Sequence, residues 1–218
     1  MTSCPHHIIW DWNGTLLDDA QVCVDAINVL LGRRRMPAIS REQYLDVFDF
    51  PIRDYYLKVG FDLEREDWTR LTVEYHTVYA ELSGVARLRP HARQILEGLR
   101  KRGGILSILS ACELAMLKRM MGERGILDSF THIYGLTDFQ AHSKLDLGHA
   151  LLGETRLPPD SAVLVGDTTH DFDVARAMGV ACVLMTGGHQ SEARLRRCGC
   201  LVVHTLHEVV AWIEGGDA

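Results

Sequence analysis

Long hydrophobic runs, an excess of positive charge and a framework of paired cysteines are all missing from this 218-residue sequence. No apolar run approaches the roughly 20 residues that a membrane helix needs, and no charged segment followed by an apolar one precedes the first expected strand. The formal net charge is −6, whereas a nucleic-acid-binding surface is usually basic. We therefore expect a cytoplasmic protein with no membrane segment and no nucleic-acid partner. The sequence does not indicate an oligomeric state.

Motifs for several common kinds of site are missing as well. The six cysteines lie in separate apolar segments, without the spacing of a disulfide framework. Cys198 and Cys200 are separated by a single residue, whereas a CxxC metal or redox motif needs two. We predict buried thiols at the cysteine positions. The first expected strand is not followed by GxGxxG, which disfavours a dinucleotide-binding domain.

Residues 18–84 show the apolar periodicity of helices and no convincing strand. Apolar residues three and four positions apart form one stripe early in the segment and another late in it. Two short candidate helices, around 41–49 and 52–59, are separated at Pro51 and closed by Gly60. We predict a compact four-helix module here. Its two stripes are Val22, Ala26, Val29 and Leu30, and Trp68, Leu71, Tyr75, Val78 and Leu82.

From Gly84 onward, candidate helices and strands alternate. This alternation predicts parallel pairing, with helices covering both faces of the sheet. After an opening strand that ends at Trp10, the expected strands are 105–109, 132–134, 162–165, 180–185 and an edge strand at 201–203. Helices are expected around 90–102, 112–121, after Lys144, at 171–178, after Ser191 and at 206–213.

Polar side chains follow the expected strands at the sheet edge where ligands bind in parallel α/β proteins. The apolar run 8–10 leads into Asp11, and the Asn-Gly-Thr sequence shortly after it predicts a sharp turn. Ser110 and Asp167 end two later strands, and Lys144 lies in a loop after another. We therefore expect these four side chains to meet at one edge of the sheet.

The residue types at this edge suit chemistry on a phosphate. Asp11 and Asp167 would bring two carboxylates together, and like charges that close need a cation between them. Ligation by oxygen atoms selects a hard cation, which points to Mg²⁺. Aspartate is a known phosphoryl acceptor in covalent catalysis, and Lys144 would hold both that carboxylate and a phosphate oxygen. Each residue alone has an ordinary interpretation as a cap, a turn or a solvated side chain. Their order and spacing favour the joint interpretation.

Hydroxyl and backbone groups at the same edge would bind the rest of the phosphate. The Ser110 hydroxyl and the backbone N–H groups around Gly14, Thr15 and Ala111 are the candidates. With Lys144, these residues form the predicted substrate-binding set.

Four segments in order carry a family resemblance. Residues 11–15, DWNGT, resemble a first motif whose usual form is DxDGT, and the apolar strand ending in Ser110 resembles a second. Lys144 falls where the lysine of a third motif is expected, and residues 165–171, VGDTTHD, resemble the fourth, GDxxxD. The sequence thus resembles the haloacid dehalogenase superfamily, in its phosphatase branch, and is similar to phosphoglycolate phosphatase-like proteins. The match covers nearly the whole chain.

The resemblance implies an α/β fold, with a Rossmann-like three-layer core around a parallel sheet and an inserted all-helical cap. Residues 1–17 and 85–218 would form the catalytic core, and residues 18–84 would form the cap. Such a cap would close over the site, exclude water and select the leaving group.

The resemblance also implies a magnesium-dependent phosphatase that acts on a small phosphorylated metabolite. Asp11 would attack phosphorus and carry an aspartyl-phosphate intermediate. Mg²⁺ would be held by the Asp11 side chain, the backbone carbonyl of Asn13 and Asp167. Asp171 would support these ligands without contacting the ion itself. Lys144 would fix the phosphoryl group together with the rest of the substrate-binding set.

Asn13 departs from the family pattern. The usual residue at this position is an aspartate that protonates the leaving group and then activates water. An amide cannot exchange a proton in this way, and the loss of a general acid/base typically costs on the order of 10²–10⁴ in rate. Three alternatives stay open: slow catalysis, a substrate with a good leaving group, or a proton from another residue. His170 and His189 are candidates for the third, although we interpret both as ordinary surface histidines.

Competing functions are ranked by the same residues. Phosphomutase chemistry needs efficient proton shuttling, so Asn13 disfavours it. Metal-independent dehalogenation would not require the acidic pair Asp167 and Asp171. The main alternative to a phosphatase is a non-catalytic or nearly inactive member that binds a phosphorylated ligand or a protein partner.

Overall fold

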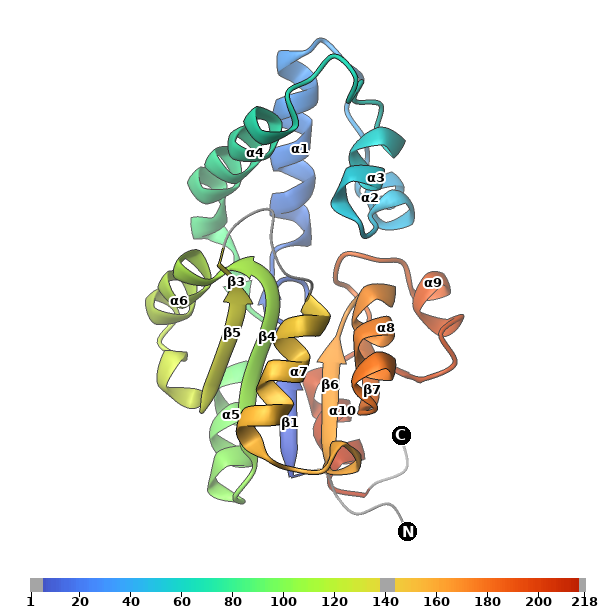
Figure 1. The fold of residues 1–218 in the computed structure, drawn as a ribbon. Helices are drawn as coiled ribbons and strands as arrows, with labels where there is room; N and C mark the ends of the chain where they lie inside the picture. The colour runs from blue at the N-terminus through green and yellow to red at the C-terminus, as the bar shows by residue number, and fades with distance from the viewer. Residues whose placement is uncertain (1–5, 138–143, 216–218) are drawn as a thin grey trace.

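The core of the protein is a parallel six-stranded sheet (Figure 1). The computed structural model describes residues 6–137 and 144–215. The strand order is β5-β4-β1-β6-β7-β8, and every neighbouring pair is parallel. The strands are β1 (His7–Trp10), β4 (Ile105–Glu113), β5 (His132–Leu136), β6 (Ala162–Gly166), β7 (Ala181–Met185) and β8 (Leu201–Val203).

Helices cover both faces of the sheet, which confirms the expected three-layer α/β fold. Side chains alternate across a strand, so Ile9 packs on one face while Ile8 and Trp10 pack on the other. The first face is covered by α7 (Lys144–Thr155) and α8 (Thr169–Met178), and the second by α5 (Ala92–Lys101) and α10 (Leu206–Ile213). The remaining core helices are α6 (Leu114–Glu123) and α9 (Glu192–Arg196), with 3₁₀ turns at Ser83–Val85, Leu127–Ser129 and Pro159–Ser161.

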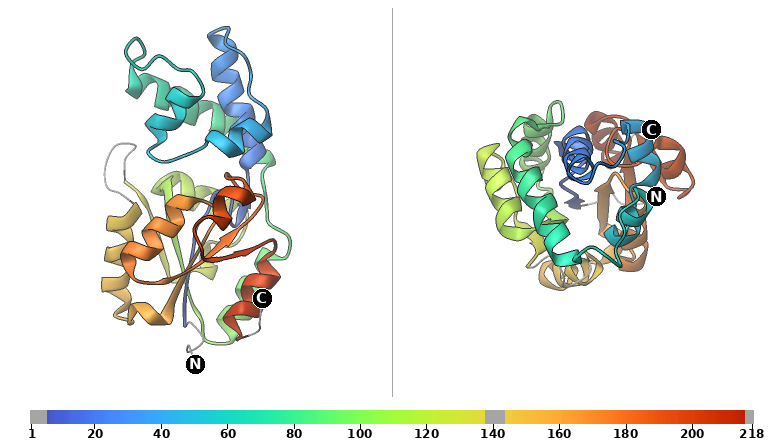
Figure 2. Two further views of the ribbon diagram at one scale, coloured as in Figure 1. Left: turned by 90° about the vertical axis from the view of Figure 1, so that its right-hand side faces the viewer. Right: turned by 90° about the horizontal axis from the view of Figure 1, so that it is seen from above.

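The first four helices of the chain, which all precede α5, form a separate layer beyond the carboxyl ends of the core strands (Figures 1 and 2). They are α1 (Ala20–Arg33), α2 (Arg41–Val47), α3 (Ile52–Lys58) and α4 (Trp68–Leu82), and we call them the helical module. Ser40 and Asp67 cap the N-termini of α2 and α4, as their side chains accept backbone N–H groups. No helix in the described parts of the chain is both long and apolar enough to cross a membrane.

Two very short strands connect the helical module to the core. β2 (Leu17–Asp18) leaves β1, and it pairs antiparallel with β3 (Arg87–Leu88), where the chain returns. Sequence periodicity misses both strands, since two residues are too few to show alternation.

Two other boundaries differ from the sequence expectation. β4 continues past Ser110 to Glu113, because the Glu113 carboxylate accepts the N–H groups of Ala115 and Met116 and so starts α6 only at Leu114. Lys144, expected in a loop, is the first residue of α7. The rest of that expected loop, 138–143, lies outside the described residues.

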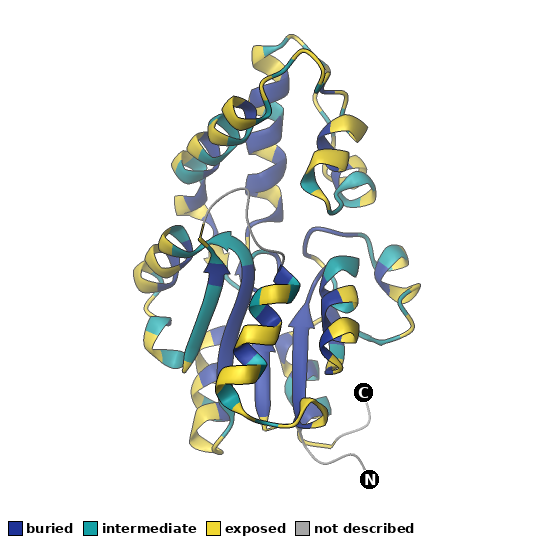
Figure 3. Ribbon diagram, in the orientation of Figure 1, coloured by how far each residue is buried: buried dark blue, intermediate teal, exposed yellow. Residues whose placement is uncertain are grey.

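The burial pattern follows this architecture. The central strands are buried over most of their length, whereas the outer surfaces of the helices are exposed (Figure 3). A polar side chain that is buried at the carboxyl ends of the strands therefore lies between the core and the helical module.

Candidate active site

The turn after β1 places Asp11 at the end of the sheet. The Asp11 N–H continues the sheet by donating to the carbonyl of Val165, and the side chain is only 7% exposed. The chain then turns tightly, with the N–H groups of Thr15 and Leu17 both donating to the carbonyl of Trp12. Gly14 has a φ of +72°, and a Cβ there would lie 2.2 Å from Oδ2 of Asp167. Glycine is therefore required both by the backbone conformation and by the close approach of that carboxylate.

Lys144 lies between two of the predicted site carboxylates. Its Nζ is 2.5 Å from Oδ1 of Asp11 and 2.5 Å from Oδ1 of Asp171, and the residue is 5% exposed. Burial alone would lower the pKa of Lys144, but the two carboxylates outweigh that effect and raise it. The lysine is therefore a fixed positive charge at the carboxyl end of the sheet.

Asp171 organises the turn after β6. Its Oδ2 accepts the N–H of Asp167 at 3.2 Å and both the N–H and the hydroxyl of Thr168, at 3.0 and 2.6 Å. Asp167 in turn accepts the hydroxyl of Thr15 at 2.8 Å and the N–H of His189 at 2.7 Å. These bonds orient the Asp167 carboxylate beside the turn that carries Asp11.

We call Asp11, Asp167 and Asp171 the acidic cluster. One carboxylate oxygen of each lies within 4.8 Å of the others, and all three residues are buried. Burial raises the pKa of Asp11 to about 8; Lys144 opposes this shift, and Asp171 and Asp167 reinforce it. Burial likewise raises the pKa of Asp167. Three buried carboxylates beside one lysine have an excess of negative charge, so their oxygen atoms fit a hard divalent cation.

Of the other predicted binding residues, Ser110 and Ala111 line a cavity together with the acidic cluster, whereas Gly14 and Thr15 are not part of its lining. Ser110 is buried at the end of β4, where its Oγ accepts the N–H of Cys112 at 3.1 Å, and Ala111 follows it. The cavity has a volume of about 540 Å³, and the acidic cluster, Lys144 and Asn13 lie on its core side. The structure thus brings the residues of all four sequence motifs together.

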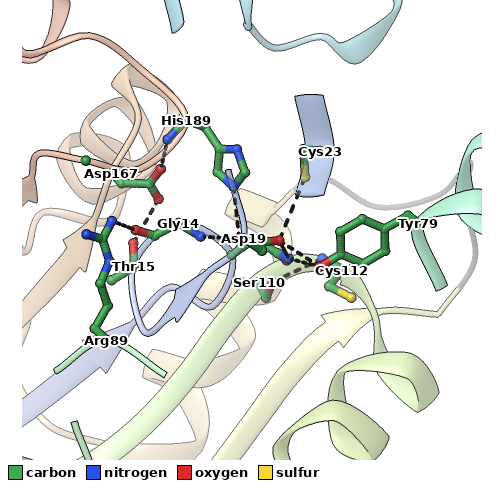
Figure 4. A network of polar contacts seen from close by, with 12 residues as sticks. Gly14, Thr15, Asp19, Cys23, Tyr79, Arg89, Ser110, Cys112, Asp167 and His189 are labelled. Carbon is green, nitrogen blue, oxygen red and sulfur yellow. Dashed lines mark hydrogen bonds and ion pairs between the residues drawn. The ribbon is translucent and has the colours of Figure 1, made fainter. Parts of the chain in front are cut away.

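The side-chain amide of Asn13 is used in hydrogen bonds and not in proton transfer. Its Nδ2 donates to Oδ2 of Asp19 at 2.6 Å and to the hydroxyl of Tyr79 at 2.9 Å. Tyr79 itself donates to the same Oδ2 at 2.7 Å, and the N–H of Gly14 donates to Oδ1 at 2.8 Å (Figure 4). The amide of Asn13 therefore serves to satisfy the buried Asp19 carboxylate, which is 0% exposed.

His189 completes this second group of contacts, which we call the Asp19 network (Asn13, Asp19, Tyr79 and His189). Nδ1 of His189 lies 2.8 Å from the hydroxyl of Tyr44, and Nε2 lies 3.4 Å from Oδ1 of Asp19, an ion-pair distance without hydrogen-bond geometry. Burial alone would lower the pKa of His189, but Asp19 and the neighbouring Asp167 and Asp11 raise it to about 9. His189 is therefore a buried cation, and the interpretation as a surface histidine is wrong.

Cys23 touches the Asp19 network without adding a metal site. Its Sγ donates to Oδ2 of Asp19 at 3.8 Å, and a ligand atom of His189 lies near both residues. Burial raises the pKa of the Cys23 thiol well above its usual range, so the thiol is protonated and acts as a hydrogen-bond donor to Asp19. The Asp19 carboxylate also already accepts several donors. This trio is therefore part of a hydrogen-bond network.

Asp19, Tyr79 and His189 are the residues that sequence reasoning missed or misjudged. Asp19 follows the exposed Asp18 and looks like one of two solvated acids. Tyr79 looks like part of a helix stripe. A buried carboxylate needs donors, but nothing in the sequence shows that Asp19 is buried.

The α2 part of the helical module is tied to the core beside this site. The N–H of Ser191 donates to the carbonyl of Leu45, and the carbonyl of Phe48 accepts both Gln190 Nε2 at 3.1 Å and Arg194 Nη1 at 2.6 Å. These contacts hold α2 against the loop that carries His189. The cavity therefore lies between the core and the helical module.

Comparison with known proteins gives the family. A model of haloacid dehalogenase-like hydrolases matches residues 8–185. Over 210 residues the chain is 27% identical to the probable phosphatase IndB of Dickeya dadantii, covering 93% of this chain and 91% of the relative. Phosphoglycolate phosphatase of Caulobacter vibrioides is 24% identical over 209 residues, covering 93% and 88%.

A third relative is named as a kinase and not as a phosphatase. Tyrosine-protein kinase PtkA of Mycobacterium tuberculosis is 28% identical over 188 residues, covering 85% of this chain and 63% of the relative. Its solved structure superimposes with a TM-score of 0.81 at 24% identity, covering 96% and 98% of the two chains. The chain belongs to the haloacid dehalogenase-like hydrolases, in the branch that acts on phosphate esters, as its motifs indicate.

Proposed function

We propose that this haloacid dehalogenase-like phosphatase is magnesium-dependent and hydrolyses a small phosphomonoester through an aspartyl-phosphate intermediate. The observation that carries the proposal is the position of Lys144 between Asp11 and Asp171, beside the Asp167 carboxylate and in the lining of a cavity. A phosphate anion that binds next to these carboxylates is repelled by their negative charge. The buried Lys144 offsets part of that charge, which supports an anion site here.

The chain's own residues account for the covalent step. An Asp11 oxygen forms a bond to phosphorus as the bond from phosphorus to the leaving oxygen breaks, and that oxygen takes the electron pair. Water then forms a new bond to phosphorus, the Asp11 oxygen recovers its electron pair, and phosphate and a proton are released. Lys144, Ser110 and the backbone N–H groups near Ala111 would bind the phosphoryl oxygens throughout.

The cation site fits Mg²⁺ by the chemistry of its donors. Asp11, Asp167 and the backbone carbonyl of Asn13 would hold the ion, and Asp171 would support them through its bonds to the Asp167 turn. When bound, the ion would neutralise charge on the transferring group. We also propose that the helical module is the cap of this enzyme, because it encloses the cavity opposite the acidic cluster.

The Asp19 network supports a phosphatase that is selective for its leaving group or attenuated. The Asn13 amide has no acidic proton, and its Nδ2 donates hydrogen bonds to Asp19 and Tyr79. The departing oxygen would thus leave without protonation from this position. The same observation favours the alternative of a nearly inactive member that binds a phosphorylated ligand or a protein partner.

One paired assay separates the two functions. Purified protein with Mg²⁺ is offered acetyl phosphate, phenyl phosphate and ordinary alkyl phosphates, and phosphate release is measured for the native chain, Asp11→Ala and Asp25→Ala. Asp25 is an exposed aspartate on α1, and its removal should leave turnover unchanged. Asp11→Ala should lower kcat by roughly 10⁴ or more.

Two results would contradict the proposal in different ways. An absence of turnover on every substrate, together with retained binding of phosphate and Mg²⁺, would favour the binding protein. Turnover that persists in Asp11→Ala would rule out Asp11 as the nucleophile.

A further inference from the structure

The wall of the active-site cavity opposite the acidic cluster is aromatic. Besides Tyr79, its lining from the helical module includes Phe48, Phe50, Tyr55, Tyr56, Trp68 and Tyr75. These rings pack edge-to-face against one another. The ring centroids of Phe48 and Tyr55 are 5.2 Å apart, and those of Tyr56 and Trp68 are 5.3 Å apart. Edge-to-face contacts of this kind stabilise aromatic clusters. The wall is therefore a preformed apolar surface.

Phe50 connects this wall to the catalytic core. Its ring stacks on the imidazole of His170, with centroids 4.5 Å apart and planes 23° apart. His170 belongs to α8, the helix that begins directly after Asp167, and it lines the same cavity. Aromatic surface thus extends from the helical module to the immediate neighbourhood of the acidic cluster.

Charges that would bind an acidic leaving group are missing from the described part of the lining. Its cations are Lys144 and His189, and both face buried carboxylates of the protein. Burial lowers the pKa of His76 to about 4, and it also lowers the pKa of His170, so both rings are neutral at neutral pH. A carboxylate on the leaving group would lose its hydration here without gaining a partner.

One polar group of the aromatic wall has no partner of its own. The Tyr55 side chain lines the cavity, the residue is 2% exposed, and its hydroxyl makes no hydrogen bond within the described residues. Buried hydroxyls usually have a partner. This hydroxyl is itself buried, so Tyr55 contributes its ring to the wall and its hydroxyl is closed to a ligand in the cavity.

The leaving-group chemistry agrees with the shape of the cavity. A phenol ionises with a pKa of about 10, whereas the pKa of water, which aliphatic alcohols resemble, is about 15.7. A phenolic oxygen can therefore leave as an anion without the proton that Asn13 cannot supply. An aliphatic oxygen would leave much more slowly.

We infer that the substrate of this site is an aryl phosphate, a phosphate monoester of an uncharged phenol whose ring packs against the aromatic wall. The inference rests on the proposed phosphatase function. The bond from phosphorus to the aryl oxygen breaks as the bond to Asp11 forms, and the aryl oxide leaves with the electron pair and takes a proton from solvent. The intermediate is then hydrolysed by water as described above.

Four substrates separate recognition of the ring from the quality of the leaving group. Phenyl phosphate has both a ring and a good leaving group, benzyl phosphate a ring and a poor one, acetyl phosphate a good leaving group without a ring, and phosphoglycolate neither. Phenyl phosphate should exceed benzyl phosphate in kcat by about 10² or more, since the general acid is missing. Benzyl phosphate should still compete for the site far better than phosphoglycolate.

Substitutions in the wall test where the ring binds. Phe50→Leu and Trp68→Leu keep apolar volume but remove a ring, and each should lower the ratio of kcat/KM for phenyl over acetyl phosphate by about fivefold. Leu57→Ala and Val73→Ala alter exposed side chains on α3 and α4 and should leave that ratio unchanged. Thermal unfolding of each variant identifies any that are merely misfolded.

The outcomes distinguish this inference from the proposed function. Turnover of acetyl phosphate that requires Asp11, with no preference for phenyl phosphate and no effect of the wall variants, would overturn the aryl assignment and leave the phosphatase intact. Efficient hydrolysis of phosphoglycolate would also overturn it. Failure on all four substrates would instead contradict the phosphatase itself.

Discussion

Asp11 directly follows β1 and Asp19 directly follows β2, and both side chains are buried, yet their surroundings differ. In the acidic cluster three carboxylates lie beside Lys144. Burial is the main cause that raises the pKa of Asp11 to about 8; Asp171 and Asp167 add to the shift, and Lys144 opposes it. In the Asp19 network, one carboxylate accepts donors from Asn13, Gly14 and Tyr79 and faces the charged His189. These partners outweigh the effect of burial, and the pKa of Asp19 is lowered.

The comparison shows what burial does to a carboxylate in each setting. Where donors and a cation surround it, the charge is stable and the residue holds the structure together. Where carboxylates outnumber cations, ionisation of all of them is unfavourable, so such a cluster would be stabilised by a metal cation between them. Position 13 belongs to both regions, because its carbonyl lies on the turn beside the acidic cluster while its amide supports Asp19.

The largest expected effect comes from breaking the Asp19 network. Asp19→Ala should lower the free energy of unfolding by about 3–5 kcal/mol, because it leaves the His189 cation and several buried donors without their acceptor. Urea denaturation followed by circular dichroism measures this change. The adjacent Asp18→Ala is a matched control, since Asp18 is exposed and should cost at most about 0.5 kcal/mol. Equal effects at the two positions would contradict the structural role of Asp19.

Exchanging the two side chains tests why position 13 is an amide. Asn13→Asp alone would place a carboxylate against that of Asp19, where Asn13 Nδ2 now lies 2.6 Å from its oxygen. The double variant Asn13→Asp with Asp19→Asn keeps one carboxylate and one amide in contact and adds an acid next to Asp11. We expect it to raise kcat on benzyl phosphate by about 10², with little gain on phenyl phosphate. An equal gain on both substrates would show that the missing acid does not explain leaving-group selectivity.

The smallest expected effect comes from supplying the acidic cluster with its cation. Mg²⁺ at ten times its dissociation constant should stabilise the native protein by about 1.4 kcal/mol, seen as a higher unfolding temperature. Asp167→Asn should abolish this shift because it removes a proposed ligand. Asp19→Asn should retain it, since Asp19 lies in the other network. A shift that survives in Asp167→Asn would place the ion elsewhere.

Much of the core could be predicted from local sequence patterns. Alternating apolar segments define a parallel sheet, and such a sheet necessarily brings the ends of its strands to one edge. Asp11, Ser110 and Asp167 were therefore expected together, and Lys144 joined them even though it opens a helix instead of lying in a loop. The two-residue strands β2 and β3 escaped notice because they are too short to have a pattern.

The cavity wall shows the limit of periodicity. The stripe on α4 was expected to be buried, and Leu71 and Val78 do lie in the core. Trp68 and Tyr75, from the same stripe, line the active-site cavity instead. Periodicity reports which side of a helix avoids water, but it does not distinguish packing against protein from facing a cavity.

By itself, the sequence determined the α/β core, the helical insertion, the family and the positions of the phosphate-handling motifs, because these depend on local alternation and on short motifs along the chain. The tertiary structure alone decided the state of Asp19, the charge on His189 and the purpose of the Asn13 amide. Tyr79 and His189 come from α4 and from the loop after β7, far along the chain from Asp19. A pKa depends on the charges and donors around a group in space, so it emerges only when those distant segments meet.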